Sequence, residues 1–154
     1  MEKSTRIRSL LLVVVSMLLA TIAIAGANEL PPSDSKPLSA ILKSVEKQEL
    51  GVITSADFDD SWWEIKVCKS PDCLKLYIDP KSGKENHRKT DDSDDELPPA
   101  NTKPLSEIVQ SLEDRNQGVI KDVEFDEGLW EIELREDGRK IKLYIDPMTG
   151  ETRR

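Results

Sequence analysis

Apolar and polar residues alternate along this chain with two periods, one typical of a helix and one typical of strands. The helical period comes first, between Pro37 and Gly51. Apolar residues spaced i, i+3, i+4 and i+7 form one stripe there: Leu38, Ile41, Leu42, Val45. Because proline suits the first turn of a helix and glycine suits its exit, one short helix is predicted between them.

The two-residue period of strands follows the helix. A first strand is predicted over about 52–58, and two further segments form a hairpin. If Cys68 faces Cys73 across the hairpin, every opposed pair on one face of it is apolar: Val67 with Leu74, Ile65 with Leu76, Trp63 with Ile78. A slip of one residue would turn these side chains to the other face, so the pattern predicts this register.

The whole pattern recurs at a constant offset, which aligns Leu30 with Leu97 and needs no insertion between Leu30 and His87. Trp130 matches Trp63, and residues 143–147 repeat the Leu-Tyr-Ile-Asp-Pro of 76–80. The second helical stripe is Leu105, Ile108, Val109, Leu112. The sequence therefore predicts an α+β fold of two tandem small modules, each with one helix packed on a three- to four-stranded antiparallel sheet.

An acidic segment, 90–96, separates the two copies and contains no apolar residue. Such a run predicts an extended, self-repelling linker. A calcium loop is the alternative, but the glycine and the distal glutamate that the usual loop requires are missing from their positions. The predicted domains are therefore 28–89 and 97–154, with the linker between them.

The segment 1–27 has the pattern of a secretory signal peptide. A basic start precedes an apolar run, and small residues follow at the cleavage spacing. Cleavage is predicted after Ala27, with Ala25 as the alternative. The run is shorter than the roughly 20 residues of a membrane-spanning helix, so no stable membrane insertion is expected after cleavage. The mature protein is predicted to be periplasmic or secreted.

The charge of the chain argues against polyanionic partners. The formal net charge is −8, and removal of 1–27, with three basic and one acidic side chain, changes it to −10. A surface of this sign repels phosphate backbones and anionic lipid headgroups. Nucleic-acid binding is therefore not expected.

The two cysteines, Cys68 and Cys73, lie in the mature part of the chain. In an oxidising compartment such a pair predicts one disulfide, which would hold the first hairpin from its outer face. A catalytic thiol pair is the alternative, although that chemistry prefers a shorter spacing at the start of a helix. The second copy has Arg135 and Lys140 at these positions.

Catalytic motifs are absent from the sequence. The single histidine, His87, lies in a polar stretch, which leaves little support for a Ser-His-Asp or Cys-His arrangement. No His-Glu-x-x-His motif and no phosphate-cradling glycine loop occurs. The chain is therefore predicted not to be an enzyme and to require no cofactor or metal.

One group of residues is a candidate contact surface for a protein partner. Because Trp63 points into the predicted core, alternation places Trp62 on the outer face of the sheet, together with Tyr77. Leu129 and Tyr144 occupy the same positions in the second copy. Exposed aromatic residues of this kind are typical of protein-binding sites. Alternatively, Trp62 packs against the linker, the other module or the disulfide.

The order of these segments resembles a PepSY domain. Residues 143–151 read Leu-Tyr-Ile-Asp-Pro-Met-Thr-Gly-Glu and residues 76–84 read Leu-Tyr-Ile-Asp-Pro-Lys-Ser-Gly-Lys, each after a helix, a strand and a Trp-Glu hairpin. The resemblance covers nearly all of the mature chain, twice. It implies a module without catalytic residues, of the kind that inhibits or helps to fold secreted metallopeptidases as a propeptide. Such domains also occur alone in exported bacterial proteins and in membrane-bound proteins.

The sequence thus predicts an exported, non-enzymatic protein-binding or regulatory module that modulates or inhibits a peptidase or a membrane sensor protein. Two alternatives stay open: a self-associating structural protein, and a small-ligand- or metal-binding protein of the cell envelope. Small open sheets have edge strands that can pair, either between the two modules or between two chains.

Overall fold

The computed structural model describes residues 29–92 and 95–153, so the predicted signal peptide lies outside the described residues. None of the helices in the described ranges is long and apolar enough to cross a membrane. The elements follow one another in the order α1 (Leu38–Glu46), β1 (Val52–Asp59), β2 (Trp62–Lys69), β3 (Asp72–Ile78), β4 (Glu85–Asp91), α2 (Leu105–Glu113), β5 (Val119–Asp126), β6 (Leu129–Glu136), β7 (Arg139–Ile145).

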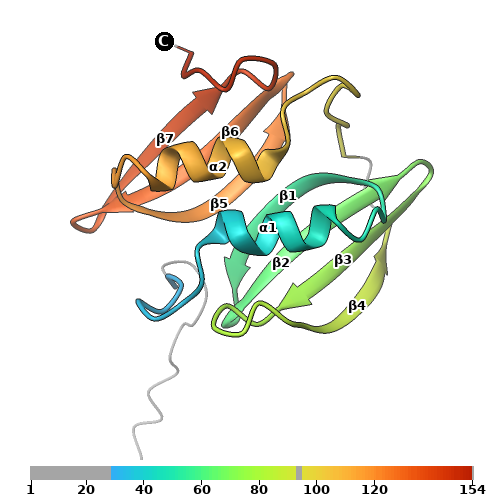
Figure 1. Ribbon diagram of the computed structural model, residues 1–154, viewed down its shortest axis with the longest axis horizontal. Helices are drawn as coiled ribbons and strands as arrows, with labels where there is room; N and C mark the ends of the chain where they lie inside the picture. The colour runs from blue at the N-terminus through green and yellow to red at the C-terminus, as the bar shows by residue number, and fades with distance from the viewer. Residues whose placement is uncertain (1–28, 93–94, 154) are drawn as a thin grey trace, which may run out of the picture.

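The strands form one seven-stranded antiparallel sheet in the order β4-β3-β2-β1-β5-β6-β7 (Figure 1). The sequence predicts two smaller sheets as the main fold, and the structure instead joins them through β1 and β5. The joint is short and comprises the pairs Ser55 with Glu124, Ala56 with Val123, Asp57 with Asp122. Because an isolated edge strand leaves its backbone groups unpaired, this junction removes one open edge from each module.

At this junction the two modules meet as the two subunits of a symmetric dimer do, although they belong to one chain. Ala56 faces Val123, and these two positions are also equivalent in the repeat, at the same offset that aligns Trp63 with Trp130. Equivalent positions of the two modules therefore meet about an approximate two-fold axis, as in an isologous contact. The two helices contact each other and cover the same face of the sheet (Figure 1).

The hairpin registers agree with the pairs that the sequence predicts. Trp63 pairs with Ile78 and Ile65 with Leu76 in the first module, and the second module repeats the arrangement. One core cluster contains buried residues of both modules. Within it, Phe58 and Phe125 meet the neighbouring tryptophans edge to face, at centroid distances of 5.4 and 5.1 Å.

The predicted acidic linker is in part ordered structure. Its first two residues, Thr90 and Asp91, belong to β4, which pairs with β3 along the edge of the sheet. Asp95 then lies against the outer face of the sheet. Its carboxylate accepts a hydrogen bond from the Thr54 hydroxyl at 3.1 Å and forms an ion pair with Lys66 at 2.8 Å. Lys66 thus holds part of this acidic segment against the sheet.

Candidate functional site

The structure does not bring the four predicted contact residues together. Trp62 and Tyr77 lie in β2 and β3, whereas Leu129 and Tyr144 lie in β6 and β7. Four strands separate β3 from β7 in the sheet, which corresponds to about 24 Å at the usual strand spacing. The residues therefore form two distant pairs, one on each module.

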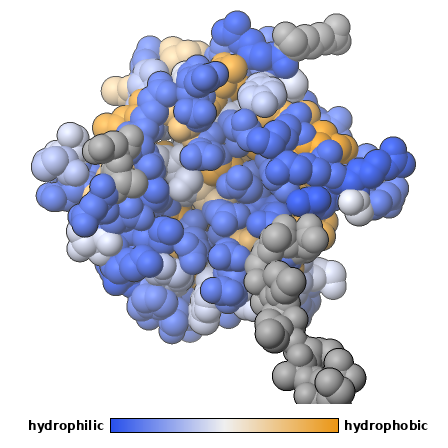
Figure 2. Space-filling model, turned by 180° about the vertical axis from the view of Figure 1, so that it is seen from behind, coloured by the Kyte–Doolittle hydropathy of each residue, from blue (hydrophilic) through white to orange (hydrophobic). Residues whose placement is uncertain are grey.

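The outer face around these pairs is mainly hydrophilic (Figure 2). Tyr77 is half-buried because its ring stacks on His87 at 4.1 Å, and Lys89 lies 5.2 Å from the ring centre. Tyr144 is 43% exposed. Trp62 is half-buried at the start of β2. Of the two tyrosines, Tyr77 on the first module is thus already engaged by the module's own β4.

The disulfide between Cys68 and Cys73 is formed, and both residues are buried. Thr54 contributes to this burial, since its hydroxyl lies 3.9 Å from the Cys68 sulfur. At the corresponding positions of the second module, Arg135 and Lys140 both pair with Glu133. The second hairpin therefore has an ion-pair cluster at the position of the disulfide in the first hairpin.

The Lys142 side chain of β7 also has an acidic neighbour, because it pairs with Glu131. In the first module Lys75 pairs with Glu64 at 2.9 Å, and this hydrogen bond raises the pKa of the Lys75 ammonium. The outer face is therefore a lattice of cross-strand ion pairs. Such exposed pairs contribute little stability individually and keep the face solvated.

A half-buried carboxyl lies at the junction of the two modules on this face. Burial, together with the neighbouring carboxylates of Asp57 and Glu124, raises the pKa of Asp122 to about 6. Lys121 opposes the shift and donates to Asp57 at 3.3 Å. Desolvation and like charge together account for this raised pKa.

The helix face of the junction is held by two reciprocal caps. Pro37 occupies the N-cap position of α1 and offers no side-chain cap. Instead, the Glu113 carboxylate at the end of α2 accepts hydrogen bonds from the Leu38 amide at 2.7 Å and from the Ser39 hydroxyl. In the same way the Glu46 carboxylate at the end of α1 accepts from the Ser106 amide at 3.0 Å. Each helix thus caps the amino terminus of the other.

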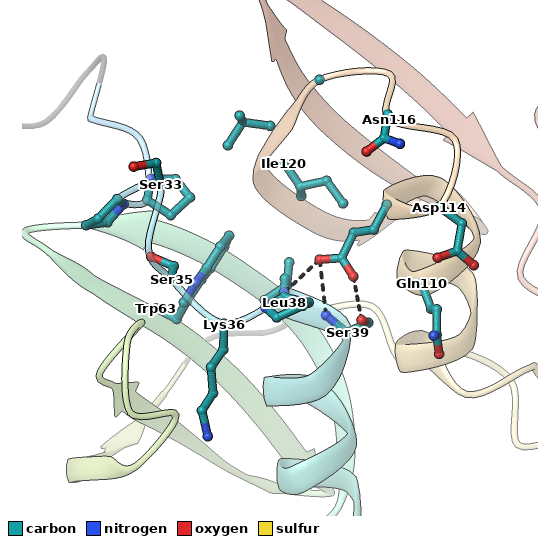
Figure 3. A pocket seen from close by; sticks show the side chains of 16 residues that line it. Ser33, Ser35, Lys36, Leu38, Ser39, Trp63, Gln110, Asp114, Asn116 and Ile120 are labelled. Carbon is teal, nitrogen blue, oxygen red and sulfur yellow. Dashed lines mark hydrogen bonds between the residues drawn. The ribbon is translucent and has the colours of Figure 1, made fainter.

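Beside each cap lies a groove that the two modules form together. The first groove has a volume of about 550 Å³. It is bounded by the 31–37 segment, Trp63 of β2, the end of α2 at Glu113, and Val119 and Ile120 of β5 (Figure 3). Its volume lies within the range typical of ligand-binding sites.

The second groove is the repeat of the first and has a volume of about 290 Å³. Its lining includes Pro98, Trp130, Glu46 and Val52, which are the repeat equivalents of Pro31, Trp63, Glu113 and Val119. The approximate two-fold axis therefore relates the two grooves as well as the strands.

Each groove contains a buried hydrogen-bond donor without a partner among the described residues. The indole Nε1 of Trp63 and the hydroxyl of Ser35 are such atoms in the first groove, and the Nε1 of Trp130 is one in the second. Buried polar groups are rarely left unbonded in proteins. Each rim has one exposed valine, Val119 at 43% and Val52 at 42%, beside polar side chains such as Lys36 in the first groove and Lys103 in the second. Each groove thus combines polar and apolar lining residues with an unsatisfied donor that is buried in its wall.

Sequence reasoning missed both grooves. Their walls come from opposite modules, so neither groove exists until β1 pairs with β5. The available signal was the repeated glutamate at the end of each helix, Glu46 and Glu113, and the proline-rich segment before each helix. No group of three or more metal-binding side chains occurs within 29–92 and 95–153.

Comparison with known proteins agrees with the repeat. The family model described as peptidase propeptide and YPEB domain, PepSY_2, matches residues 9–89 and again 92–153. No curated protein matches the chain. A crystal structure of a candidate lipoprotein from Clostridium difficile 630 is 14% identical, with a TM-score of 0.47 over 83% of this chain and 94% of that one. The chain belongs to the PepSY family of peptidase propeptide and YPEB domains and carries two tandem copies of that domain.

Proposed function

We propose that this chain is an exported, non-enzymatic regulatory module that binds a segment of a protein partner in the grooves between its two domains. The observation that carries the proposal is the duplicated groove, with an unpartnered buried tryptophan Nε1 in each copy among the described residues. The family description, which names peptidase propeptides, supports a peptidase as the regulated protein. A membrane sensor protein is the second candidate.

The chemistry of the first groove favours an extended peptide as the occupant. A main-chain carbonyl would satisfy Trp63 Nε1 or the Ser35 hydroxyl after a small movement of the groove wall, because both atoms are buried, and an N–H can donate to the Glu113 carboxylate. Apolar side chains of the peptide would pack on Val119 and Ile120 at the rim. An extended peptide presents main-chain carbonyl acceptors, N–H donors and apolar side chains in alternation.

The proposal is tested by photo-crosslinking in the native host. A photoreactive amino acid replaces Val119 or Val52 at a groove rim, and the control carries it at Met148, which is similarly exposed at 44%. Val119 and Val52, but not Met148, are expected to capture an exported peptidase or a sensor domain. The purified partner should then lose affinity for Trp63→Phe, which keeps an apolar ring and removes the Nε1 donor.

The regulatory part is tested with the captured protein. Addition of the mature chain, residues 28–154, is expected to change its peptidase rate or its signalling output, and Trp63→Phe together with Trp130→Phe should weaken this effect. Equal capture from all three positions, or capture of the chain alone, would reject groove binding and favour the self-associating alternative.

A second candidate surface is the pair Leu129 and Tyr144 on the outer face of the second domain. Tyr144 is the more exposed of the two tyrosines, at 43%. We propose it as an auxiliary contact of the same partner, with the pair Trp62 and Tyr77 as its counterpart on the first domain. The expected result is a weaker complex for Tyr144→Ala with an unchanged unfolding midpoint.

Further parts of the proposal concern export and processing. We propose cleavage after Ala27, with Ala25 as the alternative, and a mature protein that acts in the periplasm or outside the cell. The apolar run and the small residues before the cleavage site support export, and the disulfide between Cys68 and Cys73 fits an oxidising compartment. Mass spectrometry of the mature amino terminus would decide between the two cleavage sites.

A further inference from the structure

The second groove continues into an adjoining hollow, which the first groove already includes. This hollow has a volume of about 290 Å³ and shares Glu46 and Pro104 with the second groove. The repeat equivalents of these two residues, Glu113 and Pro37, both line the first groove. The second groove with its hollow is therefore the counterpart of the whole first groove, and the charged residues of the two can be compared position by position.

The first groove is negatively charged where it passes the end of α2. Glu113 and Asp114 line it there, beside the neutral Gln110. The lysine of the lining, Lys36, extends away from Gln110 and Asp114 (Figure 3). Its ammonium lies over the turn that contains Gly83. No lysine or arginine of this lining thus faces the two carboxylates among the described residues.

The corresponding part of the second groove has no net charge. Lys43 and Lys47 of the hollow stand at the positions equivalent to Gln110 and Asp114. The same hollow contains two glutamates, which balance the two lysines. The two grooves therefore share their shape and their tryptophan but differ in charge at one end.

Asp114 is available to an occupant of the first groove. Its side chain is exposed and forms no ion pair and no hydrogen bond with any described residue. Arg115, the next residue, lines a different hollow and donates to the Ser111 hydroxyl at 3.3 Å. The Asp114 carboxylate can therefore pair with a cation from outside the chain.

We propose that the first groove selects a peptide segment with a basic side chain, which Asp114 recognises, and that the second groove makes no such selection. The inference rests on the peptide binding proposed above and names the class of segment. A lysine or arginine beside the apolar residues of the segment would place its cation against Asp114, and Glu113 adds negative potential at the same end. In the second groove the same cation would approach Lys47.

The expected preference is modest and depends on salt. Exposed ion pairs change an affinity by severalfold at most, and added salt screens them. The first groove is therefore expected to bind a basic segment about fivefold more tightly than the matched acidic segment at low salt, and to lose this difference in 1 M salt.

Two tryptophans allow each groove to be followed separately. Trp63 lines the first groove and Trp130 lines the second, so the indole N–H signals in the NMR spectrum of the mature chain, residues 28–154, report on one groove each. The probe is a pool of short blocked peptides with valine, leucine and proline at random and one lysine. The matched pool has glutamate in place of lysine.

The lysine pool should shift the Trp63 indole signal at about one fifth of the concentration that the glutamate pool requires. The Trp130 signal should respond to the two pools at similar concentrations. Asp114→Lys should abolish the preference at Trp63 and leave Trp130 unchanged. Because a general effect of net charge would alter both signals, the second groove is the internal control.

A second variant gives the other groove the residues of the first. Lys43→Gln with Lys47→Asp should create a preference for the lysine pool at Trp130 and leave Trp63 unchanged. Both sites of change are exposed, so the fold is expected to persist. Neither prediction requires the other variant to fold.

The outcomes distinguish charge selection from groove binding. Equal responses of Trp63 to the two pools would overturn the selection and leave peptide binding in the grooves intact. A preference that survives Asp114→Lys would overturn the role of Asp114. If neither pool shifts either indole signal, the selection fails together with the peptide binding on which it rests.

Discussion

At the scale of single residues, adjacent side chains of similar type have different roles because alternation sends them to opposite faces. Trp63 is 1% exposed and packs edge to face on Phe58, whereas Trp62 is half-buried on the outer face. The same holds for Leu129 and Trp130 in the second module. Substitution of Trp63 therefore measures what the core contributes to the free energy of unfolding, and substitution of Trp62 measures what the surface contributes.

Truncation of the two tryptophans is expected to give different losses of stability. Trp63→Ala should lower the free energy of unfolding by about 3–5 kcal/mol, because it leaves a large cavity in the core. Trp62→Ala should cost about 1 kcal/mol or less and leave the fold intact. Urea unfolding followed by circular dichroism measures both values. A loss of folding in Trp62→Ala would show that this residue is structural and not a contact residue.

The Asp122 carboxyl predicts a pH dependence of stability. Its folded pKa of about 6 lies above the unfolded value of 3.8, so the folded state binds more protons between these values and stability falls as pH rises from about 4 to 6. Asp122→Asn removes this loss. The variant should match the wild type at pH 4 and exceed it by about 1 kcal/mol at pH 7, a value reduced for partial solvent screening.

Urea unfolding at the two pH values tests this expectation. Asp126→Asn, at an exposed position of the same strand, is the control and should leave the free energy of unfolding within about 0.5 kcal/mol of the wild type at both values. The explanation fails if Asp122→Asn shows no gain at pH 7, or if its gain is as large at pH 4.

At the scale of elements, the two hairpins share one register but are stabilised on the outer face by different means. The first uses the disulfide between Cys68 and Cys73, and the second uses Glu133 with Arg135 and Lys140. Apolar pairs on the inner face determine the register in both hairpins, so the outer-face device adds stability to a structure that is already specified.

Loss of the disulfide is therefore expected to weaken the first module without unfolding it. Cys68→Ala with Cys73→Ala should reduce the free energy of unfolding by about 2 kcal/mol, the value for a short closed loop. A reducing agent should have a similar effect on the wild type and none on the variant. Complete unfolding of the variant at room temperature would show that the bond specifies the hairpin.

At the scale of the whole molecule, the two domains form one unit. The β1–β5 pair, the contact between α1 and α2, and a core cluster with residues of both domains join them. The reciprocal caps by Glu46 and Glu113 tie each helix to its counterpart. The grooves depend on this union because each has walls from both domains.

The wild-type chain is expected to unfold in a single transition, with equal calorimetric and van't Hoff enthalpies. Glu46→Ala with Glu113→Ala removes both caps and should lower the free energy of unfolding by about 2 kcal/mol, from about 1 kcal/mol for each cap. Glu107→Ala, an exposed change in α2, is the control and should have a much smaller effect. Two separate transitions in the wild type would contradict a single cooperative unit.

Much of each domain could be predicted from the sequence because it depends on local order. The apolar stripe from Leu38 to Val45 predicts α1, and the pairing of Trp63 with Ile78 follows from alternation within one hairpin. The disulfide follows from the same register. The internal repeat then carries each inference to the second domain without new assumptions.

The junction between the domains and everything built on it were decided only by tertiary structure. Edge strands can pair with many partners, so alternation alone does not select the contact of Ala56 with Val123. The caps by Glu46 and Glu113 and the grooves beside Trp63 and Trp130 arise from that contact. The sequence by itself determined two modules and their internal registers, because those depend on neighbours along the chain. How the modules share a sheet depended on contacts between segments far apart in sequence, and these set the position of the candidate binding site.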